Sequence, residues 1–468
     1  MTLRGHSARP AFLTVQTAAA AVSPPVVPEP LQFDLPAATR LPLHLVPLGP
    51  VWAEVEGGVC APLGFRAQGA YAGLRESGVR ADVSLVVSTK DATVAKVSST
   101  ASGTAPAVEA NRRRLSGSPA SARAVVVTAG VAGSVGKGSP QACELLVQAA
   151  ADALALRQDR LLHVSVGGCC HEIGDSMAAV VQRLASSLSS SSEAAYHAAC
   201  TLTTTDTISK SAALEATLGP QHTVRLGGIA HGDGEGMQAV ITCDAAVAED
   251  VWQAMFDRAL AASFGQVAMA GRSGGHGPAD YLVALANGAA CGPIIVHGDS
   301  EAAARLEGAL TALLQGLAKE IAWDAEGTQC LLEVEVLGAP SLAEARVAAL
   351  AVAGSPCVCT AVRACDPDWA CIIDAVRGSG VEIDSANLRV SIGGMPLMHH
   401  GRPAPLAQSA AAYCREYMHA QLGRHGEVRV QVELGCGACQ AKAWGSGISC
   451  TGSVAAQQSV ELDGCLLA

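Results

Sequence analysis

Aromatic side chains are scarce in this sequence of 468 residues. Phe, Trp and Tyr together make up 3% of it, although half of the residues are apolar. A core with so few rings has to be packed from Ala, Val and Leu, with many glycines between the elements. This composition favours closely packed layers of helices and strands, that is, an α/β protein.

Long runs of basic or apolar residues are also missing. The formal net charge is -11, and the one basic cluster is Arg112, Arg113 and Arg114. Nucleic acids and anionic membranes require a positive surface, so neither is an expected partner. The most weakly polar stretch, residues 281–298, is interrupted by Gly292 and Pro293. We therefore expect a soluble chain without a membrane span.

The common catalytic and nucleotide-binding motifs are absent or incomplete. The sequence contains no His-Glu-x-x-His helix, which removes support for a zinc protease. The segment "GVAGSVGKG" (130–138) has Val131 and Gly138 where a phosphate-binding loop needs Gly and Ser or Thr. The segment "GDGEG" (232–236) lacks the third glycine of a dinucleotide turn. We expect no cofactor.

The 17 cysteines are spread along the whole chain, which is typical of reduced, buried thiols rather than of a disulfide scaffold. The alternative is a metal site, and no His lies nearby at ligand spacing. We therefore expect no metal, although the alternative stays open for two groups of residues: Cys357, Cys359, Cys365 and Cys371, or Cys436 and Cys439.

The first 50 residues have a distinct composition. They include Arg4 and Arg9, no acidic residue before Glu29, and several prolines. This pattern is typical of a transit peptide followed by a stiff linker, and it predicts a poorly ordered extension that directs the chain to the mitochondrion or another organelle matrix. The alternative is a disordered tail on a cytoplasmic protein.

From residue 51 onward, short apolar runs alternate with segments of helical periodicity. Residues 82–88, 123–130, 223–232 and 329–339 are predicted strands, whereas residues 140–156, 248–265, 301–323 and 341–354 are predicted helices. We expect an α/β or α+β protein in two lobes, 51–240 and 241–468.

Several segments, in their order along the chain, resemble the conserved blocks of the ornithine acetyltransferase (glutamate N-acetyltransferase) family. The resemblance covers residues 59 to 450, and "TTDT" followed by Lys210 is one of its two most specific parts. The other is the block around Trp369, residues 365–381. In chain order, the matching segments are "GFRAQGAYAGL" (64–74), "VVVTAGVAGSVGKG" (125–138), "VSVGG" (164–168), "TTDTISK" (204–210), "GGIAHG" (227–232), "DAEGTQ" (324–329), "CDPDWACIIDAVRGSGV" (365–381) and "AKAWGSGIS" (441–449).

This resemblance implies a function and a fold. Its members move acetyl groups between N-acetylornithine and glutamate in arginine biosynthesis, and they have a two-lobed DmpA/ArgJ-like fold with mixed sheets between helices. The precursor cleaves itself before a Thr, which then carries the acetyl group while its freed α-amine serves as base. The two lobes would match the family's alpha and beta chains.

This sequence departs from the family at the nucleophile. After the glycine-rich loop the family has an Ala-Thr-Met-Leu segment, whereas here only Gln238, Ala239 and Val240 separate Met237 from the matching strand end at Ile241. The nucleophile segment is missing. A gene-model error at this position remains an alternative explanation.

Other family positions are kept or lost. Thr205 and Glu326 match substrate-binding residues, and Gly167 keeps the amide of the oxyanion turn, whose Thr is replaced by Val166. The family's binding Lys is His231 here, and no Asn follows residue 449. Cys243 with His231 is the weak candidate for a substitute nucleophile and base, because a thiolate needs little activation.

Two functions follow from these matches and losses. The first is acetyl transfer involving N-acetylornithine or glutamate, in a form that is impaired or inactive. The second is a non-catalytic structural or assembly subunit, as a homo-oligomer or within a protein complex. Four losses in one site favour a protein without the family's catalysis.

Overall fold

The computed structural model describes the chain from Leu45 to Ser446 with several gaps. Two of the candidate site residues, Thr205 and Glu326, lie outside the described residues, as does most of the predicted N-terminal extension. The described ranges are 45–74, 80–98, 105–116, 120–129, 140–167, 176–204, 207–233, 236–269, 280–325, 327–404 and 407–446.

The larger of two sheets in the described residues has nine strands and mixed directions. Its order is β1-β6-β7-β8-β10-β3-β4-β5, with β2 also paired to β3. The parallel pairs are β8 with β10 and β4 with β5. The strands are β1 (Trp52–Glu54), β2 (Phe65–Ala70), β3 (Val83–Ser98), β4 (Ser121–Ala129), β5 (Leu161–Val166), β6 (Lys210–Gly219), β7 (His222–Gly232), β8 (Met237–Cys243) and β10 (Tyr281–Ala286).

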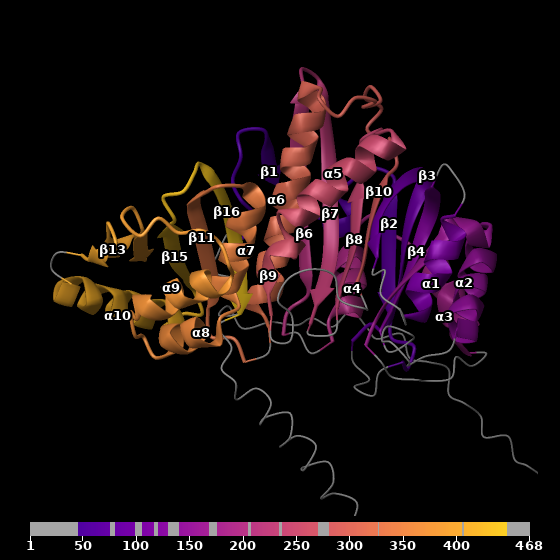
Figure 1. The fold of residues 1–468 in the computed structure, drawn as a ribbon. Coiled ribbons are helices and arrows are strands. Elements are labelled where there is room, and N and C mark those ends of the chain that lie inside the picture. Colours follow the sequence, from indigo (N-terminus) through magenta and orange to yellow (C-terminus); the bar gives the residue numbers. More distant parts are fainter. Residues whose placement is uncertain are drawn as a thin grey trace, which may run out of the picture.

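Helices cover both faces of this sheet (Figure 1). The apolar cluster beneath α5 and α6 is formed by Leu, Ala and Val with Trp252 and Phe256. A second apolar cluster lies beneath α1 and α4, and a third lies beneath α2 and α3. Every residue of β8 is buried, including the polar Gln238 and Thr242. The helices are α1 (Pro106–Arg114), α2 (Pro140–Leu154), α3 (Ser176–Ser186), α4 (Ser192–Leu202), α5 (Glu249–Ala261) and α6 (Glu301–Trp323).

The second sheet has seven strands in the described residues, in the order β14-β13-β12-β15-β11-β16-β9. Most of its apolar side chains pack against helices on one face, whereas Leu331 and Trp444 belong to the core beneath α6. The elements are β9 (Val267–Ala268), β11 (Leu331–Ala339), α7 (Leu342–Ala353), α8 (Pro356–Arg363), α9 (Trp369–Gly378), β12 (Arg389–Ile392), β13 (Met395–His399), β14 (Arg402–Pro403), α10 (Ala407–Gly423), β15 (Glu427–Glu433) and β16 (Cys439–Ser446).

The predicted α/β class, with two mixed sheets and surrounding helices, is confirmed. The predicted helix at 341–354 is present as α7, and its N-terminus is capped by the Ser341 hydroxyl, which accepts a hydrogen bond from the amide of Glu344. The expected lobe boundary at residues 240 and 241 falls inside β8, in the middle of the first sheet. Apart from β9, the second sheet begins only at Leu331.

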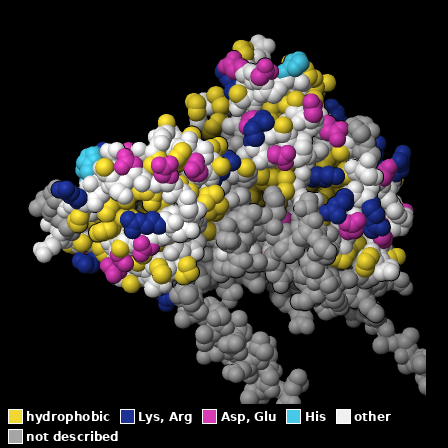
Figure 2. Space-filling model, in the orientation of Figure 1, with side chains coloured by type: hydrophobic (Ala, Val, Ile, Leu, Met, Phe, Trp, Pro, Cys, Tyr) yellow, Lys and Arg dark blue, Asp and Glu magenta, His cyan; other side chains and the backbone are white. Residues whose placement is uncertain are grey.

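In the described part of the chain, no single helix is long and apolar enough to cross a membrane. Helices α7 and α8, which are bent by 52° at their junction, satisfy the length and composition test only as a pair. On the face drawn in Figure 2, basic and acidic side chains are interspersed. This mixture of charges is consistent with the net negative charge of the sequence.

Gly227 occupies a position in β7 where no side chain fits. A Cβ atom there would lie 1.9 Å from the carbonyl oxygen of Gly58 in the 3-10 turn Gly58–Cys60. We predict that Gly227→Ala lowers the free energy of unfolding by about 1–3 kcal/mol, because the backbones must move apart. Thermal unfolding of the purified variant measures the effect.

Gly298→Ala is the matched control, since an added Cβ at Gly298 meets no atom within 4 Å. Its melting temperature should equal that of the wild type. Equal melting temperatures for Gly227→Ala and wild type would contradict the close packing of β7 on the Gly58 turn.

Candidate functional site

The start of β6, the end of β7 and the start of β8 lie at the same end of the first sheet. Lys210 is opposite Ala230 in the β6–β7 pair, and Gly232 is opposite Met237 in the β7–β8 pair. The last turn of α6 reaches the same end, because Asp324, directly after it, contacts Lys210. Three segments that are distant in sequence therefore meet here.

A buried ion pair holds these segments together. The Lys210 ammonium lies 2.5 Å from an Asp324 carboxylate oxygen, and the two side chains are 1% and 3% exposed. The same carboxylate accepts hydrogen bonds from the amides of Thr207 and Ile208, at 3.0 and 3.1 Å, and from the Thr207 hydroxyl. Asp324 thus fixes the chain directly after the segment that contains Thr205.

His231 lies on the neighbouring strand and is fully buried. Its Nε2 atom is 3.4 Å from the Thr204 hydroxyl and 3.2 Å from a carboxylate oxygen of Asp233. The structure therefore brings His231 next to the residue that precedes Thr205. It also brings Asp324, which directly follows α6 and lies two residues before Glu326, to this end of the sheet.

The connection from β7 to β8 is a tight hairpin. The amide of Asp233 donates to the carbonyl of Gly236 at 3.0 Å, and the amide of Gly236 donates to the Asp233 carboxylate at 2.9 Å. The first amide of β8, that of Met237, donates to the buried carboxylate of Asp280 at 2.7 Å. The ladder closes at Gly232 and Met237, so the chain passes from β7 to β8 with four residues in between.

The candidate pair of Cys243 and His231 is not formed. His231 is opposite Gln238 on β8, whereas Cys243 is opposite Leu226, so the two residues are separated by five positions, or roughly 17 Å along the strands. Cys243 belongs to the apolar core, and burial raises the pKa of its thiol. The sequence-based pairing is wrong because both residues lie inside paired strands rather than on a loop.

The hydroxyl of Thr242, next to Cys243 on β8, already has hydrogen-bond partners. The Thr242 side chain is fully buried and donates to the carbonyl of Val59, at 2.9 Å, with the carbonyl of Gly227 at 3.3 Å. A hydroxyl that is committed to backbone carbonyls inside a core cannot approach a substrate.

Gly167 lies directly after β5, with a φ of +73° that favours glycine. Before it, Ser165 accepts a hydrogen bond from Thr128, whose hydroxyl is also 2.7 Å from His163. Burial, with a smaller contribution from Arg114, lowers the pKa of His163 to about 3, so this imidazole is neutral. Among the described residues, Gly167 forms no hydrogen bond with His231 or its neighbours.

Glu320, one turn before Asp324 on α6, is a second buried carboxyl near the ion pair. Burial raises its pKa to about 8, against the opposing effect of Lys210. One of its oxygens is buried without a hydrogen-bond partner in the described structure. Glu320 is therefore mainly protonated at neutral pH.

Neither the cysteines nor the carboxylates of the described residues form a metal site. No group of three or more His, Cys, Asp or Glu side chains in those ranges could hold an ion. The thirteen free cysteines there are separate thiols rather than disulfides.

Sequence reasoning missed the partners of the family-matched residues. Lys210 was noted beside the "TTDT" segment, but Asp324, Glu320 and Asp280 were not. The available signal was weak, because the contact of Asp324 with Lys210 and that of Asp280 with Met237 join residues more than forty positions apart.

Comparisons with known proteins agree with the sequence blocks. A model described as "ArgJ family" matches residues 66–451. A rice protein (Oryza sativa subsp. indica) named "Arginine biosynthesis bifunctional protein ArgJ, chloroplastic" is 39% identical over 413 residues, covering 86% of this chain and 87% of its own. A Synechococcus protein named "Arginine biosynthesis bifunctional protein ArgJ" is 38% identical over 408 residues, covering 85% and 96%.

Among solved structures, the "Arginine biosynthesis bifunctional protein argJ" from Bacillus halodurans is similar to part of this chain. The sequence identity is 28% and the TM-score is 0.41, with 46% of this chain and 96% of that chain covered.

The raised pKa of Glu320 predicts a specific dependence of stability on pH. Because the pKa is higher in the folded state than the ordinary 4.5, stability is full below about pH 4.5 and is lost as the pH rises to about 8. Glu320→Gln removes the titrating group. We therefore predict that the melting temperature of the wild type falls more steeply between pH 5 and pH 8 than that of the variant.

A variant at an exposed carboxyl of the same helix, Glu301→Gln, is the control and should keep the wild-type slope. If Glu320→Gln and wild type have parallel melting profiles, Glu320 is already ionised in the folded protein.

Proposed function

The chain belongs to the ArgJ family, and we propose that it has an ArgJ-like role in arginine biosynthesis without the family's self-cleavage and covalent acetyl transfer. One observation carries the proposal: β7 continues into β8 through a hydrogen-bonded hairpin at Asp233 and Gly236. The segment that would contain the nucleophile has no place between these strands.

The chemistry supports this proposal. A Thr N-terminal nucleophile needs a hydroxyl to attack the preceding carbonyl and, after cleavage, an α-amine to act as base. Here the first residue of β8 is Met237, whose amide is used by Asp280. The nearest hydroxyl on the strand, that of Thr242, is five residues farther on and donates into the core.

We propose that the chain still binds a substrate of the family, although it does not carry out the acetyl transfer. The contact residues would be Thr205, His231, Glu326 and Gly167, with N-acetylornithine or glutamate as the ligand. In support of this, the Lys210–Asp324 pair holds the segment that follows Thr205 against the residue two positions before Glu326, and His231 lies beside Thr204.

A second proposal is a structural or assembly role. It is supported by exposed apolar side chains in the loop after β10, where Ile294 is 64% exposed and Val296 53% exposed. Such side chains would suit contact with another subunit. Under this proposal the chain would bind neither N-acetylornithine nor glutamate.

We also propose an organelle as the location. The N-terminal composition supports it, and so do the plant relatives whose names include the word chloroplastic. Mitochondrial targeting, the more specific expectation from the sequence, stays a prediction.

The proposal predicts that the purified protein remains one polypeptide through residues 233–244. Intact mass spectrometry should give a single full-length species, and acetyl transfer from N-acetylornithine to glutamate should stay at background. The rice relative, expressed and assayed in parallel, is the positive control. Cleavage near residue 236, or transfer above background that Cys243→Ala abolishes, would overturn the proposal.

Targeting is tested by fusing the chain to a fluorescent protein with and without residues 1–30. We expect the full chain to enter an organelle and the shortened chain to stay in the cytosol, because the basic, acid-free segment is removed. Identical distributions of the two fusions would contradict a transit peptide, whichever organelle is involved.

A further inference from the structure

One face of the second sheet carries mostly polar side chains, and α6 packs on part of it, where Lys319 lies over the ring of Trp444. The apolar residues of β11, β15 and β16 point to the helices on the other side, and alternate residues point to the polar face. Two rows cross this face: Arg429, Glu333 and Trp444 are opposite one another, and so are Gln431, Glu335 and Lys442.

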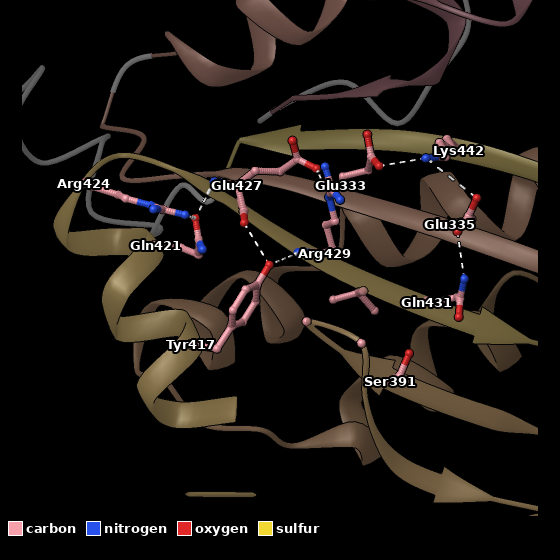
Figure 3. Close-up of a pocket in the computed structure, with 13 residues that line it drawn as sticks. Glu333, Glu335, Ser391, Tyr417, Gln421, Arg424, Glu427, Arg429, Gln431 and Lys442 are labelled. Atoms are coloured by element: carbon pink, nitrogen blue, oxygen red, sulfur yellow. Dashed lines mark hydrogen bonds and ion pairs between the residues drawn. The ribbon is translucent and has the colours of Figure 1, made fainter. Parts of the chain in front are cut away.

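A cavity of about 580 Å³ lies on this face, and we name it the C-terminal cleft. It is bounded by β11, β15 and β16 of the sheet, by the last turns of α10 and by the Gly393–Gly394 turn. The volume is within the range of small-molecule sites. Figure 3 shows its polar side chains directed toward one another across the sheet.

One wall of the cleft is built by Tyr417 of α10. Strand β12 pairs with β15 only from Val430 onward, which leaves the edge of β15 before that residue without a strand partner. The Tyr417 hydroxyl takes the place of a strand: it donates to the carbonyl of Glu427 at 3.0 Å and accepts from the amide of Arg429 at 3.3 Å (Figure 3). The wall is therefore fixed rather than left open.

The carboxylates of the cleft are already satisfied. Glu333, 5% exposed, accepts from Lys319, Lys442 and Trp444, each at 2.9 Å. Burial opposes its ionisation, but these three donors outweigh burial and lower the pKa of Glu333 to about 2. Its negative charge is thus compensated from within the protein.

The two other carboxylates have partners as well. Glu335 accepts from Gln431 at 2.8 Å and lies 3.7 Å from Lys442, and Glu427 accepts from Arg429 at 2.5 Å. None of the three acids of the cleft needs a cation from outside.

The two guanidinium groups of the cleft, unlike its carboxylates, have N–H donors without a partner among the described residues. Arg424 donates only to the side-chain oxygen of Gln421 and has no carboxylate partner among the described residues. Arg429 uses its Nε–H on Glu427, and its terminal N–H groups have no partner there, while the side chain is 68% exposed. Since each guanidinium carries five N–H donors, the cleft has unused positive donors and no unused carboxylate.

From this excess of donors we propose that the C-terminal cleft binds a small molecule with two or three carboxylate groups. Two guanidinium groups from separate elements, α10 with its following turn and β15, can each take one carboxylate, and planar guanidinium matches carboxylate geometry. This site is distinct from the one at the end of β7. It does not depend on the function proposed above.

The test is a calorimetric titration of the full chain with citrate, with inorganic phosphate as the second probe. Arg424→Gln removes a guanidinium that bonds only Gln421, so the fold should be unaffected. We expect saturable citrate binding that weakens at least tenfold in Arg424→Gln, because one anionic group of the ligand loses its partner. Phosphate should bind more weakly than citrate.

Arg363→Gln is the matched control, since Arg363 is an exposed arginine at the end of α8 and has no ion pair in the described structure. Its affinity for citrate should stay within twofold of the wild type, and so should that of His231→Gln. The proposal fails if citrate does not bind, if Arg363→Gln weakens binding as much as Arg424→Gln, or if only His231→Gln weakens it. Tighter binding of phosphate would also reject the carboxylate assignment.

Discussion

The buried ion pair between Lys210 and Asp324 is the interaction on which the organisation of the first site depends. Two charges that are almost fully removed from water need each other, because an unpaired buried charge costs several kcal/mol. The pair therefore ties the start of β6 to the end of α6. The same carboxylate binds the amides of Thr207 and Ile208, so the chain that follows residue 205 is held here as well.

The hairpin between β7 and β8 sets a second constraint, and it acts on chemistry rather than on binding. In a self-cleaving precursor the scissile segment has to leave the ladder far enough for a hydroxyl to reach the preceding carbonyl. Here the backbone bond from Asp233 to Gly236 and the bond from Met237 to Asp280 commit these amides to the ladder and its end. These hydrogen bonds stabilise the fold, and under the function we propose they also keep this segment from cleaving.

Local periodicity predicted the helices and strands well, because the apolar residues that contact the core recur along the sequence with the period of the helix or strand. The strands around Val125 and Val334 and the helix from Glu301 to Trp323 lie close to the expected ranges. The expected lobe boundary at residues 240 and 241 stays a prediction. Membership of a sheet is decided by pairing across the fold, and β8 pairs with β10, about forty residues later.

The site was predictable only where a family motif named a residue. Sequence distance suggested that Cys243 could face His231, but strand register separates them by five positions, and nothing in the local sequence specifies register. The same limit applies to the second sheet. Its polar face is visible as an alternating pattern in residues 427–433, yet the pairing of Gln431 with Glu335 and of Lys442 with Glu333 is a property of the assembled sheet.

Helix α6 links the two sheets through its last turns. Lys319 reaches Glu333 on the polar face of the second sheet, Glu320 faces the first sheet near Lys210, and Asp324 follows directly after the helix. Lys319 and Asp324 are about 7.5 Å apart along the axis, within one rigid element. Because Glu333 also binds Lys442 in the wall of the C-terminal cleft, two ion pairs and one helix connect that cleft to the chain around Thr205 and Glu326. The two sheets are thus coupled by charge at α6, which contacts both.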